Sequence, residues 1–241
     1  MSNIKIGYAN AIDFATLTAT GVSSNLPIDN VKTTNRWQVF RANSTIQTIT
    51  GTFDTVRQIG VVALWLPTGN AQNLTFDVEL YNGGTTVVAD FIDQTTSVFF
   101  DVVSVTGFMM VIRSTAPVDL SRIFMGNVFT PTYNFEFGFS MKYKDLSTSE
   151  RLEDGSLHVL KKQKYRILSL NLADILESER AKLTEMIVYS GIQNDCYVSL
   201  FNGSTGSGRT DFEMIGFFDD GAELSLTSPS RWNNKLVVNE M

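Results

Sequence analysis

Apolar and polar residues alternate, or gather in short apolar runs, through the first half of the chain. Every second residue of Thr75–Tyr81 is apolar, which predicts a strand with one buried and one exposed face. Gly60–Leu66 is apolar throughout, which predicts a central strand covered on both faces. The strands predicted in this half are Thr45–Phe53, Gln58–Trp65, Leu74–Tyr81, Thr86–Phe91, Ser97–Val102 and Phe108–Ser114. Short strands separated by turns, with no helix between them, indicate a sandwich or jelly roll.

The second half contains the one segment that reads as a long helix, directly after a strand. Four apolar residues recur at helical spacing and form one stripe: Leu172, Leu176, Leu183 and Ile187. Asp174 followed by Glu177 resembles a capping box, and Gly191 suits the position after a helix C-terminus. The pattern therefore predicts a helix from about residue 174 to residue 190 that covers a sheet.

The rest of the second half alternates short strands with longer loops. Its predicted strands are Asn134–Ser140, Tyr197–Phe201, Phe212–Phe217, Leu224–Thr227 and Leu236–Val238. Together with the helix they predict a small β-sandwich with one helix laid across it. The composition changes near Asn127–Pro131, so the expected domains are residues 1–126 and 127–241 of an all-β protein.

Composition and charge exclude several functional classes. The chain has 241 residues, of which 43% are hydrophobic and 18% charged, as expected for a folded protein. Its net charge of −6 argues against general nucleic-acid binding, which needs a basic surface. No apolar run reaches the roughly 18 residues of a membrane span, and the N-terminus lacks a signal-peptide pattern. One cysteine, Cys196, excludes an internal disulfide and is compatible with synthesis in a reducing cytoplasm.

The candidate chemical motifs each have a simpler structural interpretation. Gly203–Thr210 resembles a phosphate-binding loop, but Arg209 stands where that loop needs lysine and a strand is predicted to follow. His158 has no nucleophile to pair with, and Asp219–Glu223 lacks the alternating ligands of a calcium loop. Cys196 is expected to be a small buried residue. We therefore predict no catalytic, cofactor-binding or metal-binding residues, no cofactor, and no enzymatic activity.

The first half resembles the galactose-binding-like jelly rolls. The resemblance is carried by five segments: Asn25–Asn30, Arg36–Trp37, Gln58–Asn70, Phe108–Arg113 and Leu120–Gly126. It implies that a buried tryptophan follows an early Asn/Asp turn, at Trp37. Many of these domains bind sugars and many bind nothing, so a tryptophan could stack on a sugar ring. Trp65 lies inside an apolar run and is expected in the core, whereas Trp37 stays open between the core and a sugar platform.

The order of motifs along the whole chain resembles structural proteins of tailed bacteriophages. Arg122–Gly126 is followed by Pro131, then by Tyr133–Asn134, and Tyr165–Arg166 leads into the predicted helix. The resemblance implies a non-enzymatic distal-tail or tail-tip protein of the virion, made in the cytoplasm of the bacterial host. Its partners would be copies of itself in a ring and other tail proteins, with a host-surface glycan as a further candidate partner.

Two long loops suit such an assembly, the charged Lys142–Leu157 and the Gly-rich Asn202–Arg209. An arm from one subunit can lie across its neighbour in a ring. The alternative function is a carbohydrate-binding module or host-surface adhesin. Assembly requires an apolar surface left uncovered in the monomer, whereas sugar binding requires an exposed aromatic ring beside polar side chains.

Overall fold

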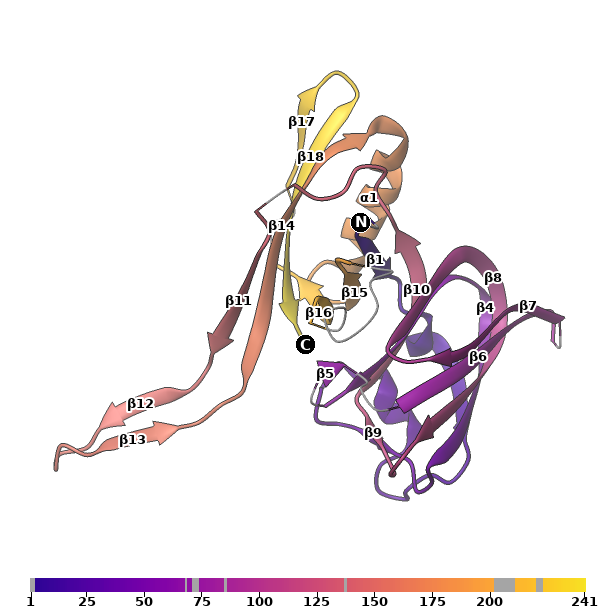
Figure 1. The fold of residues 1–241 in the computed structure, drawn as a ribbon, viewed down its shortest axis with the longest axis horizontal. Coiled ribbons are helices and arrows are strands. Elements are labelled where there is room, and N and C mark those ends of the chain that lie inside the picture. Colours follow the sequence, from indigo (N-terminus) through magenta and orange to yellow (C-terminus); the bar gives the residue numbers. More distant parts are fainter. Residues whose placement is uncertain are drawn as a thin grey trace.

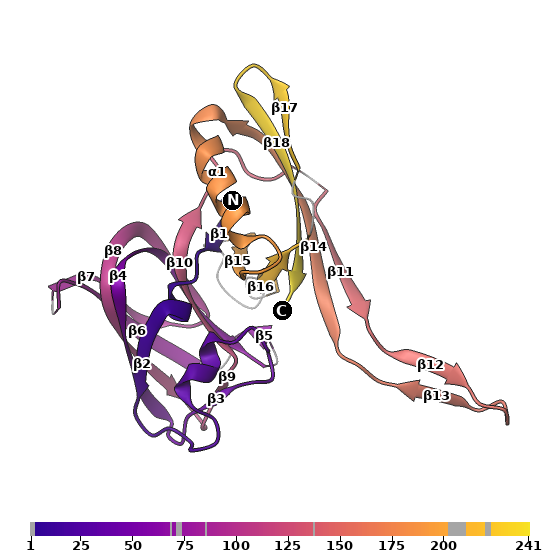
Figure 2. The same ribbon diagram turned by 180° about the vertical axis from the view of Figure 1, so that it is seen from behind.

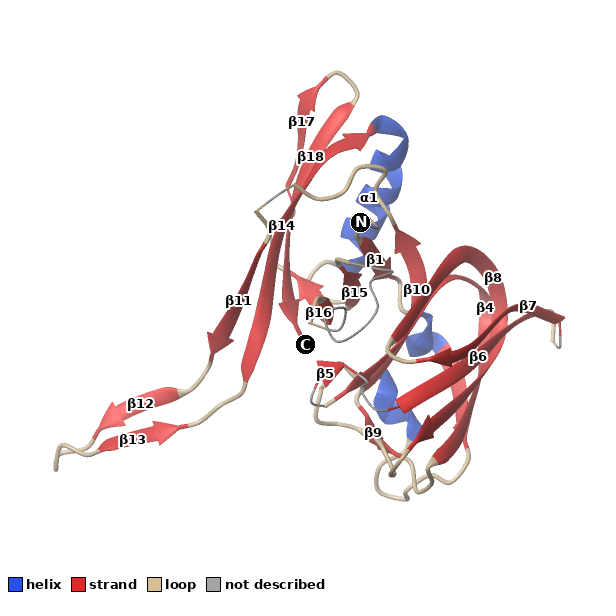
Figure 3. Cartoon of the chain, viewed as in Figure 1, coloured by secondary structure: helices blue, strands red, loops and turns tan. Residues whose placement is uncertain are grey.

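The structure, a computed structural model, describes residues 3–67, 69–70, 74–84, 86–136, 138–201, 211–219 and 223–241. Within these residues the chain is built almost wholly of antiparallel strands, with one α-helix and two short 3-10 helices (Figure 3). The all-β fold class predicted from the sequence is confirmed.

The elements of the first half follow one another with short connections. They are β1 (Lys5–Tyr8), η1 (Ala11–Phe14), β2 (Ala15–Ala19), η2 (Ile28–Lys32), β3 (Phe40–Arg41), β4 (Ile46–Leu66), β5 (Gly69–Asn70), β6 (Leu74–Asn82), β7 (Thr86–Gln94), β8 (Ser97–Ser114), β9 (Asp119–Leu120) and β10 (Arg122–Phe129). Two pairs of predicted strands are each one long strand, β4 and β8. Register shifts within β4 and β8 let the chain bend without ending the strand.

The second half contains the remaining strands and the helix. They are β11 (Ser140–Asp145), β12 (Thr148–Arg151), β13 (Leu157–Leu160), β14 (Lys164–Leu176), α1 (Glu177–Ser190), β15 (Cys196–Ser199), β16 (Glu213–Phe218), β17 (Glu223–Ser228) and β18 (Arg231–Glu240). The strand predicted at Asn134–Ser140 is wrong, because the described residues before Ser140 have no strand pairing and β11 begins at Ser140.

One sheet runs through both halves in the order β11-β14-β18-β16-β15-β1-β10-β4-β8-β6-β7 (Figures 1 and 2). Strand β1, from the start of the chain, lies between β10 of the first half and β15 of the second. Strand β10 crosses the expected domain boundary at residue 126. The two predicted domains are thus joined by continuous backbone hydrogen bonding, and their independence stays a prediction.

Strand β4 divides two hydrophobic cores. Side chains alternate across it, so Val62 and Leu64 belong to the core of the first half, whereas Val61 and Trp65 belong to the core of the second. Trp65 is 1% exposed, and the prediction of a central strand covered on both faces is confirmed. Neither core is complete without the apolar run Gly60–Leu66.

The helix α1 begins later than the sequence pattern predicted. Asp174 has a φ of 55° inside an irregular pairing of β14 with β18, and Leu172 and Ile175 are buried strand residues. The bulge explains the false helical spacing, since it changes the side-chain alternation of a strand. The N-terminal cap of α1 also differs from the predicted capping box of Asp174 and Glu177. The Glu179 carboxylate accepts a hydrogen bond from the Leu176 backbone N–H at 3.1 Å. Gly191 ends the helix as predicted, with a φ of 45°.

A long arm, residues 142–164, leaves the body of the protein at one end of the large sheet. It continues β11 and β14 into the two-stranded hairpin β12–β13, which stands away from both cores in both views (Figures 1 and 2). The charged loop predicted at Lys142–Leu157 is wrong as a loop, because these residues contain the end of β11, all of β12 and the start of β13, paired in an exposed ribbon. All of the Gly-rich loop Asn202–Arg209 lies outside the described residues.

Candidate functional site

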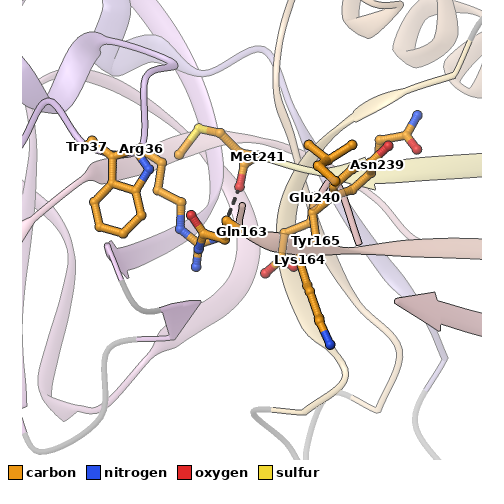
Figure 4. Close-up of a pocket in the computed structure, with 9 residues that line it drawn as sticks. Arg36, Trp37, Gln163, Lys164, Tyr165, Asn239, Glu240 and Met241 are labelled. Carbon is orange, nitrogen blue, oxygen red and sulfur yellow. Dashed lines mark hydrogen bonds between the residues drawn. The ribbon is translucent and has the colours of Figure 1, made fainter. Parts of the chain in front are cut away.

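A cleft of about 420 Å³ lies where the arm joins the body (Figure 4). Its lining comes from three places in the chain: the loop after η2, the root of the arm, and the end of β18. The lining residues are Arg36, Trp37, Leu146, Gln163, Lys164, Tyr165, Asn239, Glu240 and Met241. Residues from both halves therefore meet in one site.

Trp37 is held at the rim of this cleft by its neighbours. The Arg36 side chain donates from Nε to the Pro67 carbonyl at 2.5 Å and from Nη1 to the Met241 carbonyl at 3.4 Å. The Trp37 backbone N–H donates to Asn35 Oδ1 at 3.1 Å. The indole itself is 64% exposed, so the buried tryptophan implied by the resemblance to galactose-binding-like domains is wrong at this position.

The opposite wall of the cleft is polar and partly fixed by an ion pair. Glu240 Oε1 accepts from Arg166 Nη2 at 2.8 Å, and its Oε2 accepts from the Arg166 backbone N–H at 2.9 Å. Gln163 and Lys164 are exposed beside it, and Tyr165 is half-buried. An exposed indole near amide and hydroxyl groups offers a stacking face and hydrogen-bonding groups for a small polar ring compound.

The arm is the second candidate site, and its composition is unusual for an exposed hairpin. Every residue from Thr148 to Lys164 is exposed. Five aliphatic side chains on the arm are large and exposed: Leu146, Leu152, Leu157, Val159 and Leu160. In the hairpin register Leu157 is opposite Arg151 and Val159 is opposite Ser149, so these two apolar residues share one face. No core of the described chain covers that face.

Sequence reasoning missed a buried ion-pair network that joins the two halves. Arg122 is fully buried and donates to Asp195 at 2.7 and 2.8 Å and to Asp13 at 2.6 and 2.9 Å. Burial alone would lower the pKa of Arg122, but the hydrogen bonds and charges of the two carboxylates outweigh it and raise the pKa. An arginine at the start of the apolar run Ile123–Met125 was the available signal.

A buried carboxylate, Glu213, also escaped the sequence analysis. It is fully buried and accepts hydrogen bonds from the hydroxyl groups of Thr96 at 3.0 Å, Ser97 at 3.2 Å and Ser199 at 3.3 Å. Thr96 and Ser97 come from the first half of the chain and Ser199 from the second. The cluster therefore joins the same two halves as Arg122 does, by hydrogen bonds to a desolvated charge.

The motifs considered in the sequence do not form a reaction centre within the described residues. His158 is exposed on the arm, and Cys196 is buried, which raises the pKa of its thiol well above the ordinary value. Gly203–Thr210 lies outside the described residues, as do Asp220 and Gly221. Among described side chains, no three His, Cys, Asp or Glu are grouped to hold a metal ion. None of the described helices has the length and apolar character to cross a membrane.

Comparisons with known proteins give a fold likeness for half of the chain. No protein-family model matches, and no curated protein matches. A fucose-binding module of Streptococcus pneumoniae is similar, with 17% identity, a TM-score of 0.41, and 50% of this chain and 96% of that chain covered. The family 32 carbohydrate-binding module of C. perfringens NanJ, in complex with galactose, is similar at 15% identity and a TM-score of 0.42, covering 51% of this chain and 98% of that chain.

The lectin domain of lectinolysin, complexed with Lewis B antigen, is similar at 17% identity and a TM-score of 0.42, covering 50% of this chain and 98% of that chain. TM-scores of 0.41 and 0.42 do not support an inference about what this chain binds. The function is therefore derived from the described geometry.

Proposed function

We propose that this protein is a non-enzymatic assembly subunit that associates with copies of itself through the arm. The observation that carries the proposal is the set of exposed aliphatic side chains on a hairpin that stands away from the body. A two-stranded hairpin with no covering layer is marginally stable in water. Contact with another subunit would remove its apolar surface from water and order it.

The finer part of the proposal is the particle in which this assembly occurs. The resemblance to tailed-phage structural proteins supports a distal-tail or tail-tip component of a virion. Identical subunits that each extend one arm to the next form a heterologous contact, which closes into a ring when the rotation per subunit divides a full turn. In this proposal the protein performs no chemistry, and other tail proteins stack on the ring.

The test compares the full chain with a variant that lacks the arm. Asp145 pairs with Lys164 across the β11–β14 ladder, so residues 146–163 can be replaced by Asn-Gly, a two-residue hairpin turn. We expect sedimentation of the full chain to show oligomers that grow with concentration, and the variant to remain a folded monomer. A monomeric full chain at every concentration would overturn the proposal.

A second variant keeps the arm and removes only two of its exposed apolar side chains. Leu157→Ser with Val159→Ser retains the length and the turn of the hairpin while removing the apolar pair from one face. We expect association to weaken at least about a hundredfold, because two buried aliphatic side chains contribute roughly 1.5–3 kcal/mol each and about 1.4 kcal/mol is a factor of ten in affinity. The unfolding temperature of the body should not change.

A second candidate function, sugar binding, is favoured by the cleft. Trp37 presents an exposed ring at one side of the cleft, with Gln163 between it and Asn239 on the opposite side (Figure 4). An exposed ring with amide groups in the same cleft is the kind of surface on which a saccharide stacks. The test is titration calorimetry with fucose and galactose on the full chain and on Trp37→Ala, with Tyr143→Ala as a control for an exposed aromatic outside the cleft. Equal heats for wild type and Trp37→Ala would exclude a sugar site here.

A further inference from the structure

If the protein assembles as proposed above, the distribution of charge along the chain indicates which surface receives the arm. The arm carries six basic and four acidic side chains, a net +2 in a chain of net charge −6, so the rest of the chain carries −8. The basic residues gather at its root: Lys142, Lys144, Lys161, Lys162 and Lys164. Leu160, exposed, is next to Lys161 and Lys162, so an apolar residue and two cations lie side by side.

The other end of the sheet has the complementary character. Strand β7 pairs only with β6 among the described strands, so its outer edge is open. Asp90 of β7 lies directly opposite Glu79 of β6. Glu79 accepts a hydrogen bond from the Tyr81 hydroxyl, and neither carboxylate has an ion-pair partner among the described residues. Like charges opposite one another destabilise a strand pair. A cation from outside the monomer would relieve this repulsion.

An apolar residue lies beside these carboxylates, as it does beside the lysines of the arm. Val87 is opposite Tyr81 in the next pair on the same face of the sheet, and Val87 is exposed. Strand β7 therefore has an apolar residue near a carboxylate, and the arm has an apolar residue, Leu160, next to the cations Lys161 and Lys162. The two charges are opposite in sign. Electrostatic matching of this kind determines orientation and partner choice.

We infer that the open edge of β7, with Glu79 and Asp90, receives the root of the arm of a second copy of this chain. The arm and β7 lie at opposite ends of the molecule, so the arm cannot reach this edge in its own copy (Figures 1 and 2). Each copy then offers one arm and one β7 edge, which makes the contact head-to-tail. This inference rests on the proposed function and specifies the receiving surface.

Charge reversal of the full-length protein tests the inference. We expect Asp90→Lys to weaken self-association at least about tenfold in sedimentation equilibrium, and Lys161→Glu with Lys162→Glu to do the same. The three substitutions together should recover most of the affinity, because opposite charges again face each other. Asp54→Lys, which changes an exposed carboxylate on the distant β4, is the matched control and should leave association unchanged.

The outcomes separate this inference from the proposed function. If Asp90→Lys associates like the wild type while replacement of residues 146–163 abolishes association, the arm binds elsewhere, and the inference fails while the proposed function stands. If replacement of the arm has no effect on association, both fail. Each variant is first required to keep the melting temperature of the wild type, so that a loss of association is not a loss of folding.

Discussion

The centre of β4 and the hairpin of the arm are both strands rich in aliphatic residues, yet their surroundings are opposite. Val61 and Trp65 are covered on one face of β4, and Val62 and Leu64 on the other, all within one copy of the chain. Leu157 and Val159 of the hairpin are exposed on a two-stranded ribbon. The difference teaches that an apolar residue in a strand of this chain is buried only where a second layer covers the strand, as at β4 and not at the arm.

Separating the halves should produce the largest effect on the body. A fragment of residues 1–126 leaves Trp65 and Phe124 without the second core and Arg122 without Asp195. We expect it to unfold at a much lower temperature than the full chain, measured by circular dichroism. A fragment as stable as the full chain would instead establish two independent domains.

The next largest effect is expected at the buried arginine. Arg122→Ala leaves Asp195, which is 1% exposed, as an uncompensated buried charge, and should cost about 3–5 kcal/mol. For a chain of this length that lowers the melting temperature by roughly 10 °C. Arg41→Ala removes an exposed pair with Asp119 and is the control, expected to leave the melting temperature within about 2 °C. Equal losses for the two variants would contradict the role assigned to Arg122.

A smaller but still large effect is expected in the helix. Leu183 is fully buried in the second core, so Leu183→Asp places an unpaired charge there and should cost about 3 kcal/mol or more. Val188 of the same helix is 79% exposed, and Val188→Asp should leave the unfolding midpoint in urea nearly unchanged. If the two variants have the same midpoint, the buried face of α1 has been assigned wrongly.

The smallest effect on the body is expected from the arm. Replacing residues 146–163 by Asn-Gly removes no side chain of either core, so the melting temperature should match that of the wild type. Differential scanning calorimetry of dilute protein measures this without association. A large loss of stability would mean that the arm is part of the folded body, and the contrast with β4 would no longer hold.

Sequence patterns identified the elements whose side chains repeat with one clear period. The run Gly60–Leu66 is apolar at every position, and only a strand covered on both faces accommodates it, as the structure confirms. Leu183 was assigned to the buried face of a helix on the same grounds, and it is buried. The prediction of a helix was wrong at Leu172–Ile175, which belong to strand β14. A bulge there shifts the alternation of side chains and mimics helical spacing.

The sequence by itself determined the all-β class, the one long helix and the buried Trp65, and it identified the charged segment after Lys142 without its strands. Pairings between distant residues were decided only by the tertiary structure. Nothing local in Asp13, Arg122 and Asp195 indicates that they meet. Likewise, nothing local predicts that Arg36, next to the exposed Trp37, donates to the carbonyls of Pro67 and Met241. The physical reason is that periodicity reports which face of an element is covered, whereas the partner on that face depends on how the strands are ordered in the sheet.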